Sequence, residues 1–298
     1  MPPDNPATVG QLIRARLPFL PPAERRVAVS LLGGDPLLGL GTVADVAAAA
    51  DTSAPTVLRL LARLGFPAFA DYQAAVRREL SGRLSSPLEQ FPTHSSDSAP
   101  AVMLQSLAGS VSEDATRLPS GDLDLAVRLL ADERRRVLTL GGRFSRFLAG
   151  YLAAHLQLLR PGVSWVDASA QERAAALLDV DRRSVVAVFD FRRYQRDTVD
   201  FGAAAAAQRA HLLLFTDQYL SPLAAQADVV LPTNVESPSP FDVLTPAMAL
   251  VEVLVAGVVA RLGRRPRERM ARYDELSRDA VAVQRALAPP PDAEEANG

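Results

Sequence analysis

The first quarter of the chain has apolar residues at the spacing of amphipathic helices, interrupted by prolines and glycines. Between residues 8 and 80, apolar positions recur three and four residues apart. Prolines stand at the starts of two segments, where a missing N–H costs no hydrogen bond, and glycines follow the ends of the same two, Gly33 and Gly34 after Leu32 and Gly65 after Leu64. The pattern predicts an all-helical domain built from Val9–Leu17, Ala23–Leu32, Val43–Ala50, Ala54–Leu64 and Asp71–Leu80.

The second half has a different pattern, in which short apolar runs alternate with helical segments. The runs predict strands at Val137–Leu140, Val163–Val166, Ser184–Phe189, His211–Phe215 and Val229–Leu231. Helices are expected at Arg146–Leu159, Gln171–Leu178, Thr198–Gln208, Pro222–Gln226 and Phe241–Leu262. Strands this apolar are typical of a parallel sheet that is covered on both faces. We therefore expect a doubly wound α/β domain with a five-stranded parallel sheet, which binds ligands at the carboxyl ends of its strands.

The segment between these halves has lost its periodicity. Residues 81–100 are rich in serine and proline, which indicates a linker, and a helix is expected from Val102 to about Leu118. Ser120 and Gly121 lead into the second domain, and the charged, Pro- and Ala-rich tail follows Arg264. The predicted division is 1–82, 83–120 for the linker and connecting helix, 121–265, and 266–298 for the tail.

The composition limits the chemistry of the chain. Its 298 residues carry a formal net charge of −2, so any affinity for nucleic acid must come from a local patch. There is no cysteine, and His94, His155 and His211 lie far apart, so neither a metal site nor a cofactor is expected. The first residues lack the pattern of a signal peptide, and Met248–Ala260 is too short to span a bilayer. We expect a cytoplasmic protein with no membrane partner.

Residues 42–64 form the most informative pattern in the chain. They predict two short helices joined by a tight turn at Asp51–Ser53, the arrangement of a helix-turn-helix. In the second helix one face is apolar and is expected to point inward, while arginines lie on the opposite face, where they can pair with guanine or hold a phosphate. The predicted DNA-binding residues are Thr42, Ser53, Pro55, Thr56, Arg59 and Arg63. The alternative is the solvated surface of a small helical bundle.

The wider N-terminal segment resembles the MurR/RpiR family of bacterial transcription regulators. The resemblance depends on PAERRVA at residues 22–28, on the S-x-x-T-V-x-R core at Ser53–Arg59 and on R-L-G-F at Arg63–Phe66. Members carry a sugar-isomerase-type (SIS) domain behind the helix-turn-helix domain, and the alternating second half is similar to such a domain. The resemblance covers roughly residues 8–262.

SIS domains bind phosphosugars through loops at strand ends, and the resemblance assigns such loops here. The first loop usually reads G-x-G-x-S and is Gly141-Gly142-Arg143-Phe144-Ser145 in this chain, where an arginine replaces the second glycine. Ser145 also starts a helix, so its hydroxyl is either part of an anion site or a plain helix cap.

The second loop departs further from the family pattern. It usually reads S-x-S-G-x-T, and aligning Thr198 with the threonine puts Asp190 and Arg192 on the serines and Arg193 on the glycine. Guanidinium groups can clamp a phosphate or carboxylate by charge, or form a surface ion-pair cluster that binds nothing. Asp190 would repel an anion unless an arginine neutralises it. Glu236, after the last strand, corresponds to a glutamate that serves as a base in isomerase members, and otherwise is a solvated loop residue.

These observations favour a DNA-binding transcriptional regulator whose SIS-like domain senses a small anionic metabolite, a sugar phosphate or a related compound. We expect a double-stranded DNA operator and a small-molecule effector as partners, and a homodimer or homotetramer. The alternatives are a phosphosugar isomerase with an accessory helical domain, and a regulator whose SIS-like domain only dimerises. The predicted effector residues are Gly141, Gly142, Arg143, Ser145, Asp190, Arg192, Arg193, Thr198 and Glu236.

Overall fold

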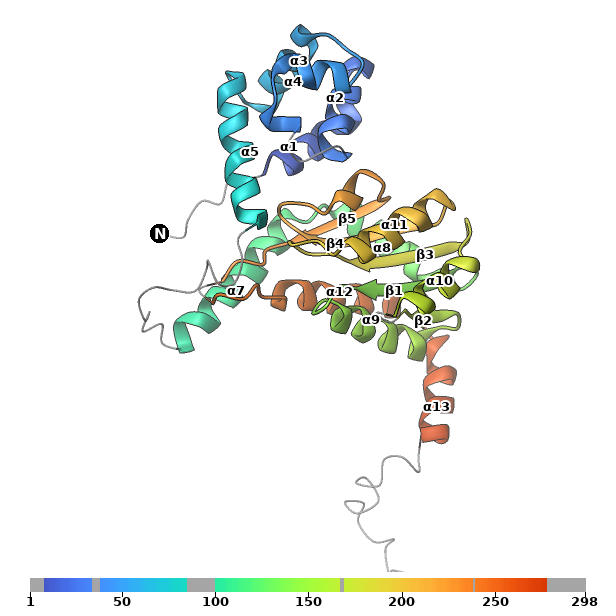
Figure 1. The fold of residues 1–298 in the computed structure, drawn as a ribbon. Coiled ribbons are helices and arrows are strands. Elements are labelled where there is room, and N and C mark those ends of the chain that lie inside the picture. Colours follow the sequence, from blue (N-terminus) through green and yellow to red (C-terminus); the bar gives the residue numbers. More distant parts are fainter. Residues whose placement is uncertain (1–7, 34–37, 85–99, 167–168, 238, 278–298) are drawn as a thin grey trace, which may run out of the picture.

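The computed structural model describes residues 8–33, 38–84, 100–166, 169–237 and 239–277, which form a helical domain beside an α/β domain (Figure 1). The predicted segments at 85–99 and 278–298, and Gly34 after the second helix, lie outside the described residues. The helical domain consists of α1 (Val9–Arg16), η1 (Leu17–Phe19), α2 (Pro22–Gly33), η2 (Leu38–Leu40), α3 (Val43–Ala49), α4 (Ala54–Leu64) and α5 (Phe69–Leu84). The five predicted helices are all present.

One apolar core holds the helical domain together. Each helix contributes a buried side chain to it, among them Ile13, Val27, Val46, Leu60 and Tyr72. Burying side chains of this size stabilises by about 1.5–3 kcal/mol each relative to exposing them. The core therefore fixes which face of each helix remains outside.

The α/β domain is built around five parallel strands. Its elements are α7 (Pro100–Arg117), α8 (Ser120–Ala131), β1 (Arg136–Gly141), α9 (Arg146–Leu159), β2 (Val163–Trp165), α10 (Ala170–Leu178), β3 (Ser184–Phe189), α11 (Arg196–Ala207), β4 (His211–Asp217), η3 (Pro222–Ala225), β5 (Val229–Thr233), α12 (Thr245–Leu262) and α13 (Pro266–Ser277). The strand order is β2-β1-β3-β4-β5, and every pair is parallel. The five-stranded parallel sheet predicted from the apolar runs is confirmed.

The two faces of the sheet have separate cores. Successive side chains of a strand point to opposite faces, so Val185 and Ala187 pack with α8, α9 and α12, while Val186 and Val188 pack with α10, α11 and η3. The central strands β3 and β4 are buried along nearly their whole length because both faces are covered, whereas the edge strand β2 is partly exposed. Strand order reverses between β1 and β3, so the carboxyl ends of these two strands border the crevice where such sheets bind ligands.

Several helix boundaries differ from the predictions. Ser120 and Gly121 begin α8 rather than a connection, and α8 buries Leu129 and Leu130 against the sheet. The long apolar helix starts at Thr245, not at Phe241, because Pro246 occupies its first turn. The first part of the charged tail forms the helix α13. This helix was not predicted, because its polar composition gives no apolar face that would indicate packing.

Among the described residues, α12 is the one helix long and apolar enough to cross a membrane by length and composition. It packs against α8 and α9 on the sheet and buries Leu250, Val251, Leu254 and Val258 there. A core helix of an α/β domain has the same composition, so its apolar character is explained by this packing.

Helix α1 joins the two domains, as Figure 1 shows. At its start, Thr8 Oγ1 donates a 2.7 Å hydrogen bond to the Gln218 carbonyl at the end of β4. Near its end, the Arg14 guanidinium donates to the carbonyls of Ala224 and Ala227. These contacts place the helical domain over the carboxyl end of β4 and over η3.

Candidate nucleic-acid interface and ligand site

Local capping sets the geometry of the α3–turn–α4 unit. Thr42 caps α3 and forms a capping box with Asp45, in which each side chain satisfies the backbone N–H of the other residue. Asp51 takes a positive φ of 47° in the turn, and Gly65, with φ of 96°, ends α4. The chain can therefore reverse sharply on both sides of α4.

The apolar stripe of α4 points inward as predicted. Val57, Leu60, Leu61 and Leu64 are all buried in the core of the helical domain. This burial leaves Pro55, Leu58, Arg59, Ala62 and Arg63 exposed on the outer face of α4.

Thr56 lies differently from its predicted orientation. It was expected to point away from the core, but only 4% of it is exposed. Its Oγ1 lies 3.0 Å from the Ser53 hydroxyl and accepts a 2.9 Å hydrogen bond from the Arg59 guanidinium. Ser53 occupies the N-cap position, a place where a serine side chain usually caps the helix, but it makes no side-chain bond to the helix backbone. Thr56 thus orients Arg59 from below the outer face.

Arg63 is held differently from Arg59. Its Nε lies 2.9 Å from Glu24 Oε2, an ion pair whose geometry does not meet that of a hydrogen bond. The Arg63 side chain is 56% exposed and that of Glu24 only 6%. Arg63 therefore neutralises a buried carboxylate of α2, whereas Arg59 has no acidic partner among the described residues.

The charge of the helical domain differs in sign from that of the whole chain. Residues 8–84 contain nine arginines and six acidic residues, a formal net charge of +3, although the complete chain has −2. A positive domain with an exposed arginine on a helix is the electrostatic pattern expected of a DNA-binding surface.

At the end of β1, the glycine-rich loop is tied to its neighbours. Ser145 Oγ donates a 2.7 Å hydrogen bond to the Phe189 carbonyl of β3 and accepts one of 2.9 Å from the Gly142 N–H. Gly141 must be glycine, because a Cβ there would lie 2.6 Å from the Arg146 nitrogen. The Ser145 side chain makes no capping bond to α9. Its hydroxyl instead fixes the switch-point crevice between β1 and β3.

Gln195 lies over this loop. Its Oε1 accepts a hydrogen bond from the Arg143 backbone N–H, and a Cβ on Gly142 would lie 2.5 Å from the same oxygen. An anion that uses this N–H must displace the Gln195 amide. The Arg143 side chain itself is exposed.

Asp190, at the end of β3, is a buried carboxyl group. It is 2% exposed, and its Oδ2 accepts a 2.5 Å hydrogen bond from Ser221 Oγ. Burial raises its pKa to about 7, against the smaller opposing effect of the Ser221 bond and with a further rise from Asp217. At neutral pH Asp190 is thus a partly protonated group. Thr198 is fully buried in the first turns of α11.

Arg192 and Arg193 both lie near the carboxylate of Asp242. Arg192 Nε donates a 2.8 Å hydrogen bond to Asp242 Oδ1, and its side chain is almost completely buried. Arg193, with φ of 67° and a partly exposed side chain, lies 3.8 Å from Asp242 Oδ2. The carboxylate of Asp242 therefore already holds the Arg192 guanidinium, and an incoming anion has to compete with it.

Glu236 lies at the far end of a connected polar group. It accepts hydrogen bonds of 2.9 Å from Gln218 Nε2 and of 3.0 Å from the Tyr219 hydroxyl. Burial, followed by Glu236, raises the pKa of Tyr219 to about 12. The Tyr219 ring in turn lies 6.0 Å from the Arg192 guanidinium.

Several residues of this site are not marked by the sequence pattern. They are Arg173, Gln195, Asp217, Tyr219 and Asp242. Arg173 is buried and donates to the Gly141 carbonyl, and Asp217 accepts from the Arg192 N–H. An acidic residue directly after the apolar run of β4 was the available signal for Asp217. Within the described residues no cluster of metal-ligating side chains occurs.

Comparisons with known proteins agree with this architecture. Residues 129–257 match the SIS domain family. The curated relatives include the bifunctional protein glk of Burkholderia thailandensis, 28% identical over 178 residues that cover 58% of this chain and 27% of the relative. The equivalent protein of Paraburkholderia xenovorans is 29% identical over the same share. The matched segment thus spans about a quarter of the length of these relatives.

Two solved structures share the fold. The sugar-isomerase domain of an RpiR transcription factor from Sphaerobacter thermophilus has a TM-score of 0.56 and 21% identity, covering 61% of this chain and 99% of that one. NanR of Vibrio vulnificus, solved in complex with ManNAc-6P, has a TM-score of 0.54 and 18% identity, covering 91% of this chain and 98% of that one.

The family match, the parallel sheet and the loop at its switch point define a SIS domain in residues 129–257. Over 91% of its length the chain shares the fold of NanR, and over 61% it shares that of the sugar-isomerase domain of an RpiR transcription factor, in agreement with the resemblance expected from the sequence.

Proposed function

We propose that this chain is a DNA-binding transcriptional regulator whose SIS domain binds a small anionic metabolite, a sugar phosphate or a close relative. The observation that carries the proposal is the exposed Arg59 on α4 of a positively charged helix-turn-helix domain, directly preceding a SIS domain. The bound ManNAc-6P in the related NanR structure supports the class of effector. No part of the proposal requires catalysis, and a cytoplasmic location follows from binding the genome.

In the proposed complex, α4 enters the major groove. Pro55, Leu58, Arg59 and Ala62 form its exposed face, so Arg59 reaches base edges while Leu58 and Ala62 make apolar contacts. Ser53 stands at the start of α4 without a side-chain bond to the helix backbone, so the N–H groups of this first turn favour a phosphate. Thr42 stands at the start of α3, where it already forms a capping box with Asp45. Arg63 holds Glu24 and contributes charge at the edge of this surface.

The functional unit we propose is a homodimer or homotetramer. One helix-turn-helix reads one half-site, and two half-sites one helical turn apart require two copies. α12 offers a surface for a second copy, because Val253, Ala256 and Val259 lie exposed along one side of it. Glu252 on the same side limits this stripe to a narrow apolar band.

The arginine cluster after β3 suggests how an effector acts. A phosphate has a higher charge than a carboxylate and can form several charge-assisted hydrogen bonds, so it can displace Asp242 from Arg192 and Arg193. Asp242 precedes α12 by three residues. Its release would therefore bias the position of the helix that carries the proposed dimer surface, and with it the spacing of the two α4 helices.

The DNA-binding part of the proposal is tested with the Arg59→Ala variant. We expect a loss of about 1–3 kcal/mol in specific operator binding if Arg59 reads a base, measured by fluorescence anisotropy on a site found by genomic footprinting. Arg134→Ala, which changes an exposed arginine in the SIS domain, is the matched control and should bind normally. Unchanged binding by Arg59→Ala, or the absence of any protected site, would contradict the proposal.

The effector part is tested with an Arg192→Gln, Arg193→Gln double variant. We expect it to bind operator normally without effector and to lose the response to sugar phosphates, because the guanidinium groups that hold the anion are gone. Asp242→Asn should raise effector affinity, since the internal competitor is neutralised. An unchanged response in the double variant removes this site, and aldose–ketose isomerisation that requires Glu236 would replace the regulator by an enzyme.

A further inference from the structure

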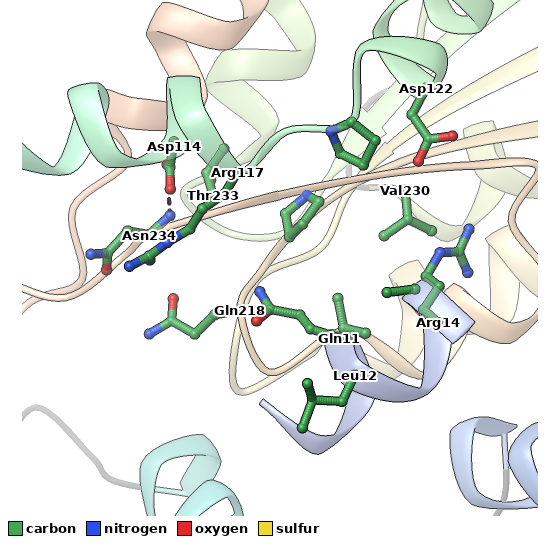
Figure 2. Close-up of a pocket in the computed structure, with 14 residues that line it drawn as sticks. Gln11, Leu12, Arg14, Asp114, Arg117, Asp122, Gln218, Val230, Thr233 and Asn234 are labelled. Carbon is green, nitrogen blue, oxygen red and sulfur yellow. Dashed lines mark hydrogen bonds between the residues drawn. The ribbon is translucent and has the colours of Figure 1, made fainter. Parts of the chain in front are cut away.

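A cavity of about 390 Å3 lies where the helical domain meets the SIS domain. In Figure 2, side chains of α1 lie on one side of it and those of α7 and the start of α8 lie on the other. Residues of β5 and residues that follow β4 complete the lining. The volume is within the range of small-molecule sites. None of the strand-end residues predicted to bind the effector lines it.

Two buried polar atoms in the wall of this cavity lack a hydrogen-bond partner among the described residues. They are Gln218 Oε1 and Thr233 Oγ1, from residues only 7% and 2% exposed. Buried polar groups are rarely left unpaired in folded proteins, because losing water without gaining a partner is unfavourable. Both atoms belong to residues that line the same cavity, so one bound molecule can satisfy both.

The charged groups of the cavity show what kind of molecule fits. Its lining holds Asp114, Asp122, Arg14 and Arg117, a formal balance of zero. The Arg14 guanidinium already donates to the carbonyls of Ala224 and Ala227, and Arg117 lies 3.4 Å from Glu113. The guanidinium groups are therefore engaged, and the lining offers an anion no uncommitted positive charge.

Acceptors are the groups that remain for a ligand. Asp114 uses one carboxylate oxygen to accept a 2.8 Å hydrogen bond from the Asn234 N–H, and its other oxygen is on the same short side chain at the cavity wall. Burial raises the pKa of Asp114 to about 6. This value is still below neutral pH, so the carboxyl group is mainly ionised there and accepts hydrogen bonds. Gln218 Oε1 also accepts only, and the Thr233 hydroxyl can accept or donate. Between these groups, Leu12, Leu220 and Val230 give apolar walls.

We propose that this interdomain cavity is a second small-molecule site, specific for a neutral polyhydroxylated compound of monosaccharide size. Its hydroxyl groups donate to Gln218 Oε1, Thr233 Oγ1 and the Asp114 carboxylate, and its C–H faces pack on the apolar walls. A phosphate group is disfavoured, because the lining has no net positive charge and the phosphate would lie beside the carboxylates of Asp114 and Asp122.

The site touches both domains, so its occupation bears on their relative position. The residue whose Oε1 would receive the ligand, Gln218, also accepts the Thr8 hydrogen bond that holds the start of α1, and donates through Nε2 to Glu236. A ligand there strengthens the α1–SIS contact. This consequence rests on the proposed regulator function, whereas the binding itself does not.

The test uses the full chain without DNA. Isothermal titration is done with D-glucose, D-mannose, D-ribose and myo-inositol, with the 6-phosphates of the two hexoses, and with putrescine as a cationic probe. We expect saturable binding of at least one neutral compound, weakened at least tenfold by Thr233→Val and by Gln218→Leu. Thr116→Val is the matched control, because Thr116 is exposed on α7 beside the cavity without lining it. It should bind like the wild type.

The melting temperature of Thr233→Val without ligand is a second measurement, and it shows whether this variant still folds. Because the Thr233 hydroxyl has no hydrogen-bond partner among the described residues, Thr233→Val without ligand should melt at the same temperature as the wild type or higher. A clearly lower melting temperature would contradict the proposal by showing that this hydroxyl is already satisfied.

Each remaining result of the titration also decides the matter. No binding by any neutral compound, binding of putrescine alone, or binding unaffected by Thr233→Val would overturn the proposal. Loss of the neutral compound's binding in Arg192→Gln with retention in Thr233→Val would place it at the strand-end site instead. The titration contains no DNA, so its outcome does not depend on whether the chain binds DNA. The proposed regulator function and the proposed second ligand site can therefore fail separately.

Discussion

Asp190 is the residue whose charge state depends most clearly on the fold. Its ordinary pKa is near 4, and burial beside Ser221 and Asp217 raises it to about 7. Between these two pH values the folded chain keeps a proton that the unfolded chain has lost. The free energy of unfolding therefore falls as pH rises from about 4 to 7, and above that range the penalty is complete.

We expect Asp190→Asn to remove this dependence, because an amide cannot ionise and its oxygen still accepts from Ser221. Relative to the wild type, the variant should gain stability as pH rises, by on the order of 1 kcal/mol per pH unit across the window. Urea denaturation at pH 4.5, 6 and 8 measures the difference. Asp200→Asn, an exposed carboxylate on α11, serves as the control and should show no such trend. A difference that does not vary with pH for Asp190→Asn would refute the assignment.

Arg160 shows the structural use of a charged residue. It is completely buried, and its guanidinium donates to the carbonyls of Leu130 and Asp132 at 2.8 Å and to those of Pro161 and Arg135. It thereby ties the end of α8 to the turns before β1 and β2.

Replacing Arg160 with methionine should destabilise the SIS domain by about 3 kcal/mol or more, since several buried carbonyls lose their donor. Chemical denaturation gives the value, and Arg134→Met, at a side chain 90% exposed, should stay within about 0.5 kcal/mol of the wild type. Similar small effects for both variants would show that water replaces the guanidinium.

At the scale of one element, α4 separates two arginines that look alike in sequence. Arg59 is held by Thr56 on the outer face, and Arg63 faces the buried Glu24 of α2. One turn of helix therefore separates Arg59, the proposed DNA contact, from Arg63, which supports the domain.

We expect Arg63→Ala to lower the stability of the helical domain by about 1 kcal/mol or more, because it leaves the Glu24 carboxylate buried without its counter-charge. Arg59→Ala should change stability by less than about 0.5 kcal/mol. Thermal and urea unfolding of both variants, followed by circular dichroism, distinguish them. The reverse order of stabilities would mean that the roles of the two arginines are exchanged.

At the scale of the whole molecule, the exposed stripe of α12 requires an explanation. Val253, Ala256 and Val259 remain outside although α12 is otherwise a core helix. A second copy packed on this stripe would cover it and would also bring two α4 helices into one assembly.

A Val253→Glu, Val259→Glu double variant should therefore shift the chain toward monomer, because two carboxylates would be buried without partners in the interface. Light scattering after size exclusion reports the mass. Leu178→Glu introduces the same charge at an exposed position of α10 and should leave the oligomer intact. An oligomer that withstands the double variant must use another surface.

Much of this architecture is encoded locally. The apolar stripe Val57, Leu60, Leu61 and Leu64, the capping Thr42 and the terminating Gly65 define α4 without any distant contact. The five apolar runs likewise predict a covered parallel sheet, because consecutive apolar residues such as Val185–Phe189 need burial on both faces. α8 was not predicted, because Gly121 in its first turn is typical of a connecting loop. Its apolar side is buried only by contact with the sheet, which the local sequence does not show.

The sequence by itself determined most of the elements, with α8 and α13 as exceptions, and the order in which they follow one another. The tertiary structure alone decided the electrostatic partner of each charge, because Glu24 and Arg63, or Arg192 and Asp242, are distant in the chain and meet only through packing. It also decided that Thr56 and Asp190 are buried, since burial at an element's edge depends on what packs over it. Periodicity records which face of an element is apolar, but the partner of a polar atom is fixed by folding.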